Sequence, residues 1–241
     1  MMKLTAICCT YLRSHLLDHL LECWLRQDYP KDRCELVILD DAGEYRPQRG
    51  ANWQLVSIDR RFSSLGEKRN ASAALASMDT DAFCVWDDDD LYLPWALSAS
   101  ARALEQAPLS RPSRVLYLEG DHWKQCLTGG LYHGGWAYTK EAFRRVAGYR
   151  YLSGPEDQEF LKRLLSAGVQ TADPLADGTP PFYSYVDDTN SFHISWIGSN
   201  DPVWAGLGKM KHDGFKETLN PHWHQDLAAL PILPEVHPRP F

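Results

Sequence analysis

The chain has 241 residues, of which 44% are hydrophobic and 24% are charged, a composition typical of a soluble globular protein with a sizeable core. Its formal net charge of −7 argues against general affinity for nucleic acids or anionic membranes, because both require a basic surface. The six cysteines have no C-x-x-C spacing and mostly lie within apolar runs, as buried thiols in a reducing compartment do. No signal peptide is visible, and no apolar run approaches the roughly 20 residues that span a bilayer. We therefore expect a cytoplasmic protein of one large or two small domains.

The first half of the chain predicts alternating strands and helices. Buried strands are expected at residues 4–10, 36–39, 54–58 and 82–86, and helices at residues 16–24 and 65–78. Ser14 is the predicted N-cap of the first helix, which should end before Pro30. This order implies a mostly parallel sheet covered by helices, whose ligands bind at the carboxyl ends of the strands. Residues 10–11, 40–41 and 87–90 follow strands and should face one crevice.

The second half has a less regular pattern. A strand is expected at residues 115–118, and helices at residues 94–106, 140–146 and 155–167. Pro155 suits the first position of the last of these helices. Four glycines between residues 128 and 136 indicate a loop of close backbone approach that leads into another strand. The remainder is rich in proline and should be mostly loop, with an extended tail from about residue 231.

Four consecutive aspartates, residues 87–90, follow the apolar strand pattern of residues 82–86. Adjacent carboxylates repel one another by roughly 1 kcal/mol per close pair even in water, so the run must be fully solvated or neutralised by a cation. Oxygen-only ligands favour Mg²⁺ or Mn²⁺ over zinc. In an extended segment Asp87 and Asp89 would share one face, with Asp88 and Asp90 on the other. A solvated capping loop is the alternative interpretation of this run.

Taken together, these motifs resemble the inverting glycosyltransferases of family 2, which have the GT-A fold, a Rossmann-like central mixed sheet flanked by helices. Five segments match the family's motifs in order over residues 4–165. They are CTYLR with QDYP (9–13, 27–30), VILDDAG (37–43), GEKRNA (66–71), WDDDD as the D-x-D metal motif (86–90), and GPEDQEF as the G-x-E-D-x-E catalytic helix (154–160).

The resemblance implies a role for each matching residue. Asp41 would contact the nucleobase, Asp87 the ribose or donor sugar, Asp89 the Mn²⁺ or Mg²⁺ ion, and Asp157 would be the catalytic base. Further donor-binding residues would be Thr10, Tyr11, Arg13, Lys68, Arg69 and Asp88. His193 is a candidate second metal ligand, and Glu156, Trp136 and Trp196 are candidates for binding the acceptor.

Structural interpretations of the same residues remain open at this point. Asp41 could be a turn residue, Arg69 a surface charge, and Glu156 with Asp157 could favour a helix N-terminus through its dipole. Core packing would account for Trp136 and Trp196 equally well, and an ordinary half-buried position for His193.

The implied function is transfer of one sugar from a UDP-, GDP- or dTDP-sugar to a hydroxyl of a glycan or another acceptor, with inversion. The chain would be one continuous domain with a nucleotide-sugar-binding half (1–110), an acceptor half carrying the base (111–200) and a loop-rich tail (201–241). Two departures from the family are Ala42-Gly43-Glu44 in place of Gly-Ser, and Lys68 in place of a small residue. A nucleotide-sugar-forming nucleotidyltransferase and a non-catalytic nucleotide- or glycan-binding module are the alternatives. The sequence does not specify an oligomeric state.

Overall fold

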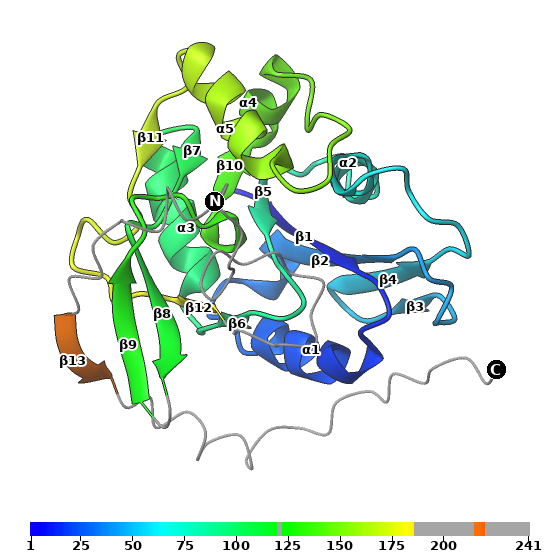
Figure 1. Ribbon diagram of the computed structural model, residues 1–241, viewed down its shortest axis with the longest axis horizontal. Helices are drawn as coiled ribbons and strands as arrows, with labels where there is room; N and C mark the ends of the chain where they lie inside the picture. The colour runs from blue at the N-terminus through cyan, green and yellow to red at the C-terminus, as the bar shows by residue number, and fades with distance from the viewer. Residues whose placement is uncertain (120–121, 186–214, 220–241) are drawn as a thin grey trace.

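The computed structural model describes residues 1–119, 122–185 and 215–219 (Figure 1). Its main sheet has eight strands in the order β11-β7-β10-β5-β1-β2-β4-β3. These strands are β1 Leu4–Thr10, β2 Cys34–Asp40, β3 Gln48–Arg49, β4 Trp53–Ser57, β5 Ala82–Val85, β7 Leu109–Ser110, β10 Ala137–Thr139 and β11 Thr171–Ala172. In the part of the chain described, no helix is long and apolar enough to cross a membrane.

A second sheet of five strands has the order β13-β9-β8-β12-β6. It consists of β6 Leu91–Tyr92, β8 Arg114–Glu119, β9 His122–Leu127, β12 Tyr183–Tyr185 and β13 Phe215–Leu219. The helices are α1 Leu17–Leu25, α2 Leu65–Ala74, α3 Ala96–Gln106, α4 Lys140–Arg145 and α5 Glu156–Ser166, with short 3-10 turns η1 Ser14–Leu16, η2 Lys31–Arg33 and η3 His133–Gly135.

The centre of the main sheet is parallel. Strands β4, β2, β1 and β5 run in the same direction, and β10 and β3 join them as antiparallel strands. Strands β1 and β2 pair over their full length, from Leu4 opposite Cys34 to Thr10 opposite Asp40. Both are buried almost throughout, as expected of parallel strands covered by helices on both faces. The expected α/β fold with a central mixed sheet is thus confirmed, and the carboxyl ends of β1, β2 and β5 lie along one edge.

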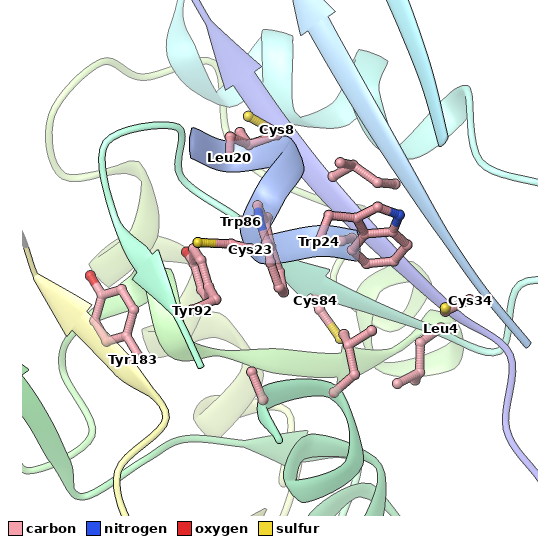
Figure 2. Packing of buried hydrophobic residues seen from close by; sticks show 14 of the residues in the cluster. Leu4, Cys8, Leu20, Cys23, Trp24, Cys34, Cys84, Trp86, Tyr92 and Tyr183 are labelled. Carbon is pink, nitrogen blue, oxygen red and sulfur yellow. The ribbon is translucent and has the colours of Figure 1, made fainter. Parts of the chain in front are cut away.

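Two hydrophobic clusters cover the two faces of this sheet. Alternation along β1 places Leu4, Ala6 and Cys8 in the cluster that contains the apolar residues of α1 and α3. Ile7 points the other way, into the cluster formed with α2, α4 and α5. In the first cluster Trp24 meets Trp86 edge-to-face with ring centroids 5.6 Å apart (Figure 2). Packing on both faces therefore holds the sheet edge rigidly.

Some element boundaries differ from the sequence-based expectations. Ser14 makes no capping hydrogen bond and lies within η1, so its prediction as the N-cap of the first helix is wrong. Helix α2 ends at Ala74 rather than near residue 78, and the Ser77 N–H and hydroxyl bond to Glu35 of β2 instead. Pro155 is the N-cap of α5 rather than its first residue. The short strand β6 and strand β9 were not anticipated.

The N-terminus of α2 is fixed against the segment that leads into α5. Ser64 caps the helix by accepting a hydrogen bond from the Glu67 N–H. The Gly66 N–H donates to the Leu152 carbonyl over 3.0 Å, and a Cβ at Gly66 would lie 1.8 Å from the Arg150 carbonyl oxygen. Only glycine permits this approach, which ties the helix carrying Lys68 and Arg69 to the helix carrying Asp157.

We predict that Gly66→Ala destabilises the protein by about 1–3 kcal/mol, because the added methyl group forces two backbone segments apart. Urea unfolding would measure the change in the free energy of unfolding. At an unconstrained helix position the same substitution would stabilise by roughly 0.5–1 kcal/mol. A gain in stability would therefore contradict the close approach.

Candidate active site

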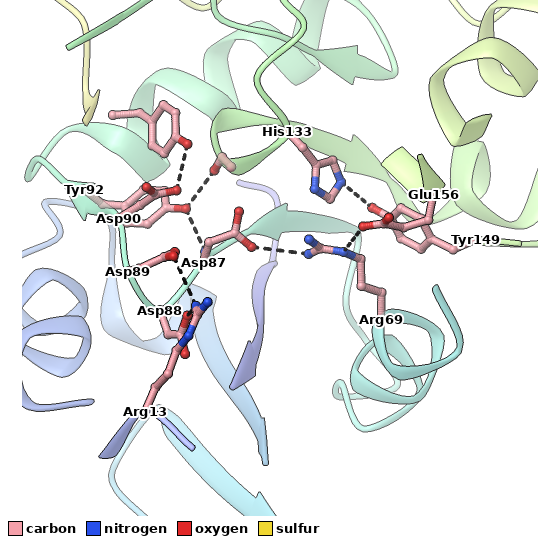
Figure 3. A network of polar contacts seen from close by, with 12 residues as sticks. Arg13, Arg69, Asp87, Asp88, Asp89, Asp90, Tyr92, His133, Tyr149 and Glu156 are labelled. Carbon is pink, nitrogen blue, oxygen red and sulfur yellow. Dashed lines mark hydrogen bonds and ion pairs between the residues drawn. The ribbon is translucent and has the colours of Figure 1, made fainter. Parts of the chain in front are cut away.

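Charged side chains from five segments lie at the carboxyl edge of the main sheet, and Figure 3 shows those of Arg13, Arg69, the aspartate run and Glu156. Arg13 follows β1, Asp41 follows β2, and the four aspartates follow β5. Lys68 and Arg69 come from α2, and Glu156 and Asp157 begin α5. The segments after β1 and β5 contact each other directly through Arg13, and Lys68 links Thr10 after β1 to Asp41 after β2.

The aspartate run turns directly after β5, and Arg13 binds two of its carboxylates. Arg13 Nη1 lies 2.6 Å from Asp88 Oδ1 and 3.1 Å from Asp89 Oδ2. The expectation that Asp88 and Asp89 point to opposite faces of an extended segment is wrong, because the chain forms a turn at these two residues. Leu12, with φ +54°, lies in the left-handed region immediately before Arg13, so a strained turn carries this guanidinium to the cluster.

Arg69 bridges the donor half and the predicted base helix. Its Nη1 lies 3.4 Å from Asp87 Oδ1 and its Nε lies 3.4 Å from Glu156 Oε1 (Figure 3). The guanidinium is buried, and although burial alone would lower its pKa, the neighbouring Asp87 and Glu156 raise it well above the ordinary value. The surface-charge interpretation of Arg69 is therefore wrong. Tyr92 supports the same turn, because its hydroxyl accepts a hydrogen bond from the Asp87 N–H over 2.8 Å.

Asp41 is buried at the end of β2 and is held by three donors. Lys68 Nζ and Arg61 Nη1 lie 2.5 Å and 2.8 Å from its Oδ1, and the Phe62 N–H donates to its Oδ2. Lys68 also donates to the Thr10 carbonyl, which joins β1 to the same cluster. The turn after β2 is stabilised by the neighbouring Asp40 rather than by Asp41, because the Asp40 carboxylate accepts hydrogen bonds from the N–H groups of residues 42 and 44.

Glu156 and Asp157 differ in their contacts at the start of α5. Glu156 is buried and accepts hydrogen bonds from Arg69 and, over 3.0 Å, from the Gly154 N–H. Asp157 is partly exposed and accepts from the Gln158 N–H and side-chain amide. Burial is the largest influence on Asp157 and raises its pKa above the ordinary aspartate value. Burial thus outweighs the stabilisation of the ionised form that a helix N-terminus provides.

The remaining predicted positions divide into buried residues and residues outside the described ranges. Trp136 is 1% exposed and donates its indole N–H to the Gly130 carbonyl, so core packing accounts for it and its predicted acceptor contact finds no support. The Arg61 guanidinium lies over the ring of Tyr11. His193 and Trp196 lie outside the described residues.

The aspartates fit a divalent ion held partly by a substrate. Asp88 Oδ2 is buried and has no hydrogen-bond partner among the described residues. Within those residues, no group of three or more His, Cys, Asp or Glu side chains gathers around one point. Mg²⁺ in nucleotide sites is commonly held by one or two carboxylates together with waters and phosphate oxygens, so a three-residue cage is not required. The oxygen-only donor set of Asp88 and Asp89 meets that description.

Sequence reasoning missed Arg61 and His133. Arg61 follows β4 at the same sheet edge as Asp41, so the predicted strand order could have identified it as a candidate site residue. His133 lies in the glycine-rich loop and contacts the Tyr149 hydroxyl over 2.9 Å (Figure 3). Burial, followed by the nearby charge of Arg69, lowers its pKa well below the ordinary value, so the imidazole is neutral.

We predict that Arg69→Met lowers the free energy of unfolding by about 3 kcal/mol, because it leaves the buried Glu156 and the partly buried Asp87 without their cation. Urea unfolding would measure this loss. The matched control is Arg145→Met on α4, an exposed arginine whose replacement should change stability by no more than about 0.5 kcal/mol. Equal effects of the two substitutions would show that Arg69 is not a structural bridge.

No protein-family model and no curated protein match this sequence. Solved structures do match the fold. Residues 1–349 of TarS from S. aureus, in complex with UDP-GlcNAc, match with a TM-score of 0.63 and 16% identity over 79% of this chain and 60% of that chain. The mannosyltransferase PcManGT from Pyrobaculum calidifontis, in complex with GDP-Man and Mn²⁺, matches with a TM-score of 0.59 and 18% identity over 81% and 60%. The chain thus spans less than two thirds of each of these chains, and the likeness shows that it has the GT-A glycosyltransferase fold.

Proposed function

We propose that this protein is a metal-dependent inverting glycosyltransferase that moves one sugar from a nucleoside diphosphate sugar to an acceptor hydroxyl. The observation that carries the proposal is the bridge from Asp87 through Arg69 to Glu156, because it joins the nucleotide-facing sheet edge to the helix that bears Asp157. The GT-A fold shared with structures that hold UDP-GlcNAc and GDP-Man supports it. The inverting part of the proposal rests on the order of the motifs that resemble glycosyltransferase family 2.

The donor would lie along the carboxyl ends of β1, β2 and β5. Asp41 can accept N–H groups of a nucleobase, and Tyr11 offers a ring on which a base can stack. Arg13, Lys68 and Arg69 supply cationic groups suited to the diphosphate. Thr10 lies beside them, and its buried hydroxyl has no hydrogen-bond partner among the described residues.

The chemistry assigned to Asp157 is general-base catalysis. The acceptor oxygen forms a bond to the anomeric carbon on the face opposite the diphosphate, and the bond from that carbon to the phosphate oxygen breaks. The leaving nucleoside diphosphate takes the electron pair, and the acceptor proton passes to the Asp157 carboxylate. Attack from the opposite face inverts the anomeric configuration. Glu156 positions this helix start through Arg69 and the Gly154 N–H.

Asp88 and Asp89 would hold Mn²⁺ or Mg²⁺ together with oxygens of the diphosphate. When bound, the ion neutralises charge that develops on the leaving nucleoside diphosphate. Arg13 offsets part of the charge of the two carboxylates, and its guanidinium keeps them in place beside the donor position.

The direct test is release of nucleoside diphosphate from a panel of UDP-, GDP- and dTDP-sugars, with and without Mn²⁺. A glycosyltransferase should release the nucleotide slowly by hydrolysis and faster with an acceptor, in both cases with the metal. A nucleotidyltransferase would instead form a nucleotide sugar from a sugar phosphate and a nucleoside triphosphate. A binding module would bind the donor without turnover, and either of these results would refute the proposal.

We predict that Asp157→Asn lowers kcat by roughly 10²–10⁴-fold, the usual contribution of a general base, while donor affinity stays within about twofold. Because the pKa of Asp157 is raised, the wild-type rate should fall on acidification above the usual aspartate range near pH 4, as the base becomes protonated. Steady-state kinetics between pH 4 and 9 would show both effects. Near-normal turnover by Asp157→Asn would remove Asp157 from the mechanism.

For the metal, we predict that Asp89→Ala and Asp88→Ala each weaken Mn²⁺ binding by at least about tenfold in calorimetry. Both substitutions should have this effect because the turn places both carboxylates beside Arg13. Asp59→Ala, at an exposed aspartate, is the control for loss of one negative charge and should have little effect. Mn²⁺ affinity equal to that of the wild type in both cluster variants would exclude the aspartate turn as the metal site.

A further inference from the structure

Arg61 makes two contacts that define a planar position at the sheet edge. Its guanidinium carbon lies 3.5 Å from the centroid of the Tyr11 ring, which is a stacking distance. Its Nη1 donates to Asp41 Oδ1 over 2.8 Å. The side chain reaches this position from the loop after β4, and it is 56% exposed. Arg61 thus covers an aromatic face and bonds to a buried carboxylate at the same time.

A guanidinium in this position presents the same features as a nucleobase. It is flat, it stacks on an aromatic ring, and its edge carries N–H donors aimed at a carboxylate. Uracil, thymine and guanine each have a stacking face and at least one ring N–H donor. Resting on the proposed function, we propose that Arg61 is a built-in occupant of the nucleobase position, which an incoming nucleotide must displace from Tyr11 and Asp41.

The remaining contacts of Asp41 make this displacement feasible. Lys68, which is buried, stays bonded to Asp41 Oδ1, and the Phe62 N–H stays bonded to Oδ2. Loss of Arg61 therefore leaves Asp41 paired with a buried cation, whereas loss of Lys68 would leave it only the exposed Arg61. Because the Arg61 side chain is largely exposed, its charge returns to water without a large desolvation cost. The arrangement combines a permanent buried partner with a removable exposed one.

A nucleotide binds only to molecules in which Arg61 has left Tyr11 and Asp41. Its apparent affinity is therefore the intrinsic affinity multiplied by the fraction of such molecules. An exposed ion pair and a cation–π contact are each individually weak. Together these two contacts should reduce the apparent nucleotide affinity roughly 3- to 30-fold. Removal of Arg61 should raise the affinity for ligands that carry a base by the same factor and leave the affinity for ligands without a base unchanged.

The experiment is calorimetry of UDP, GDP and inorganic pyrophosphate, each with Mn²⁺, binding to the wild type, Arg61→Ala and Arg60→Ala. Arg60 is the exposed neighbouring arginine, so its variant has the same net charge. We expect Arg61→Ala to bind at least one of UDP and GDP roughly 3- to 30-fold more tightly than the wild type. Arg60→Ala should bind with equal or slightly weaker affinity, and pyrophosphate affinity should not increase in either variant. Arg61→Lys, which keeps the charge but stacks less well, should be intermediate.

Three results would overturn the inference. Nucleotide affinity in Arg61→Ala that equals or falls below that of Arg60→Ala would mean that Arg61 does not compete with the base. Equal tightening of pyrophosphate would place the effect at the phosphates rather than at Tyr11. Absence of UDP and GDP binding to all the proteins would also overturn the inference, and the donor panel with dTDP-sugars would then decide the proposed function separately. The first two results leave the proposed function standing.

Discussion

The structure of the site depends on one buried guanidinium. Arg69 lies between Asp87, at the end of a central strand, and Glu156, at the start of α5, and it reaches both through different nitrogens. A carboxylate removed from water needs a cation or several hydrogen-bond donors, and here one arginine pairs with two carboxylates. The ion pairs therefore hold the base helix against the sheet edge. The contact between Gly66 and the backbone near Arg150 also holds α2 against the segment that leads into α5.

The same principle extends across the whole site. Asp41 is paired with Lys68 and Arg61, and the Asp88–Asp89 turn is paired with Arg13. Most of the acidic groups that the proposed mechanism uses thus have a cation from their own chain, whereas Asp157 accepts hydrogen bonds from Gln158 instead. A substrate and its metal must therefore enter a site in which several carboxylates are already paired. We expect exposed partners such as Arg61 to move and buried partners such as Lys68 to stay.

The sequence predicted those parts of the fold that follow from local periodicity. The apolar run of β1 was assigned within its observed bounds, and the position of Asp41 and Asp87 at strand ends followed from the α/β order. Turn geometry was not accessible in this way. The backbone turn at Asp88 and Asp89, and the left-handed Leu12 that aims Arg13 at it, depend on contacts between segments about 75 residues apart. The raised pKa of Asp157 likewise could not be predicted from the sequence, because its burial depends on distant elements.

The central claim is that this site transfers a sugar with inversion. Time-resolved proton NMR of the first product formed from an α-linked donor, with Mn²⁺ and an acceptor or water as nucleophile, tests it most directly, because the anomeric coupling constant reports the configuration before mutarotation. The account predicts that the β-anomer appears first. Initial formation of the α-anomer would contradict the assigned in-line attack and the role of Asp157.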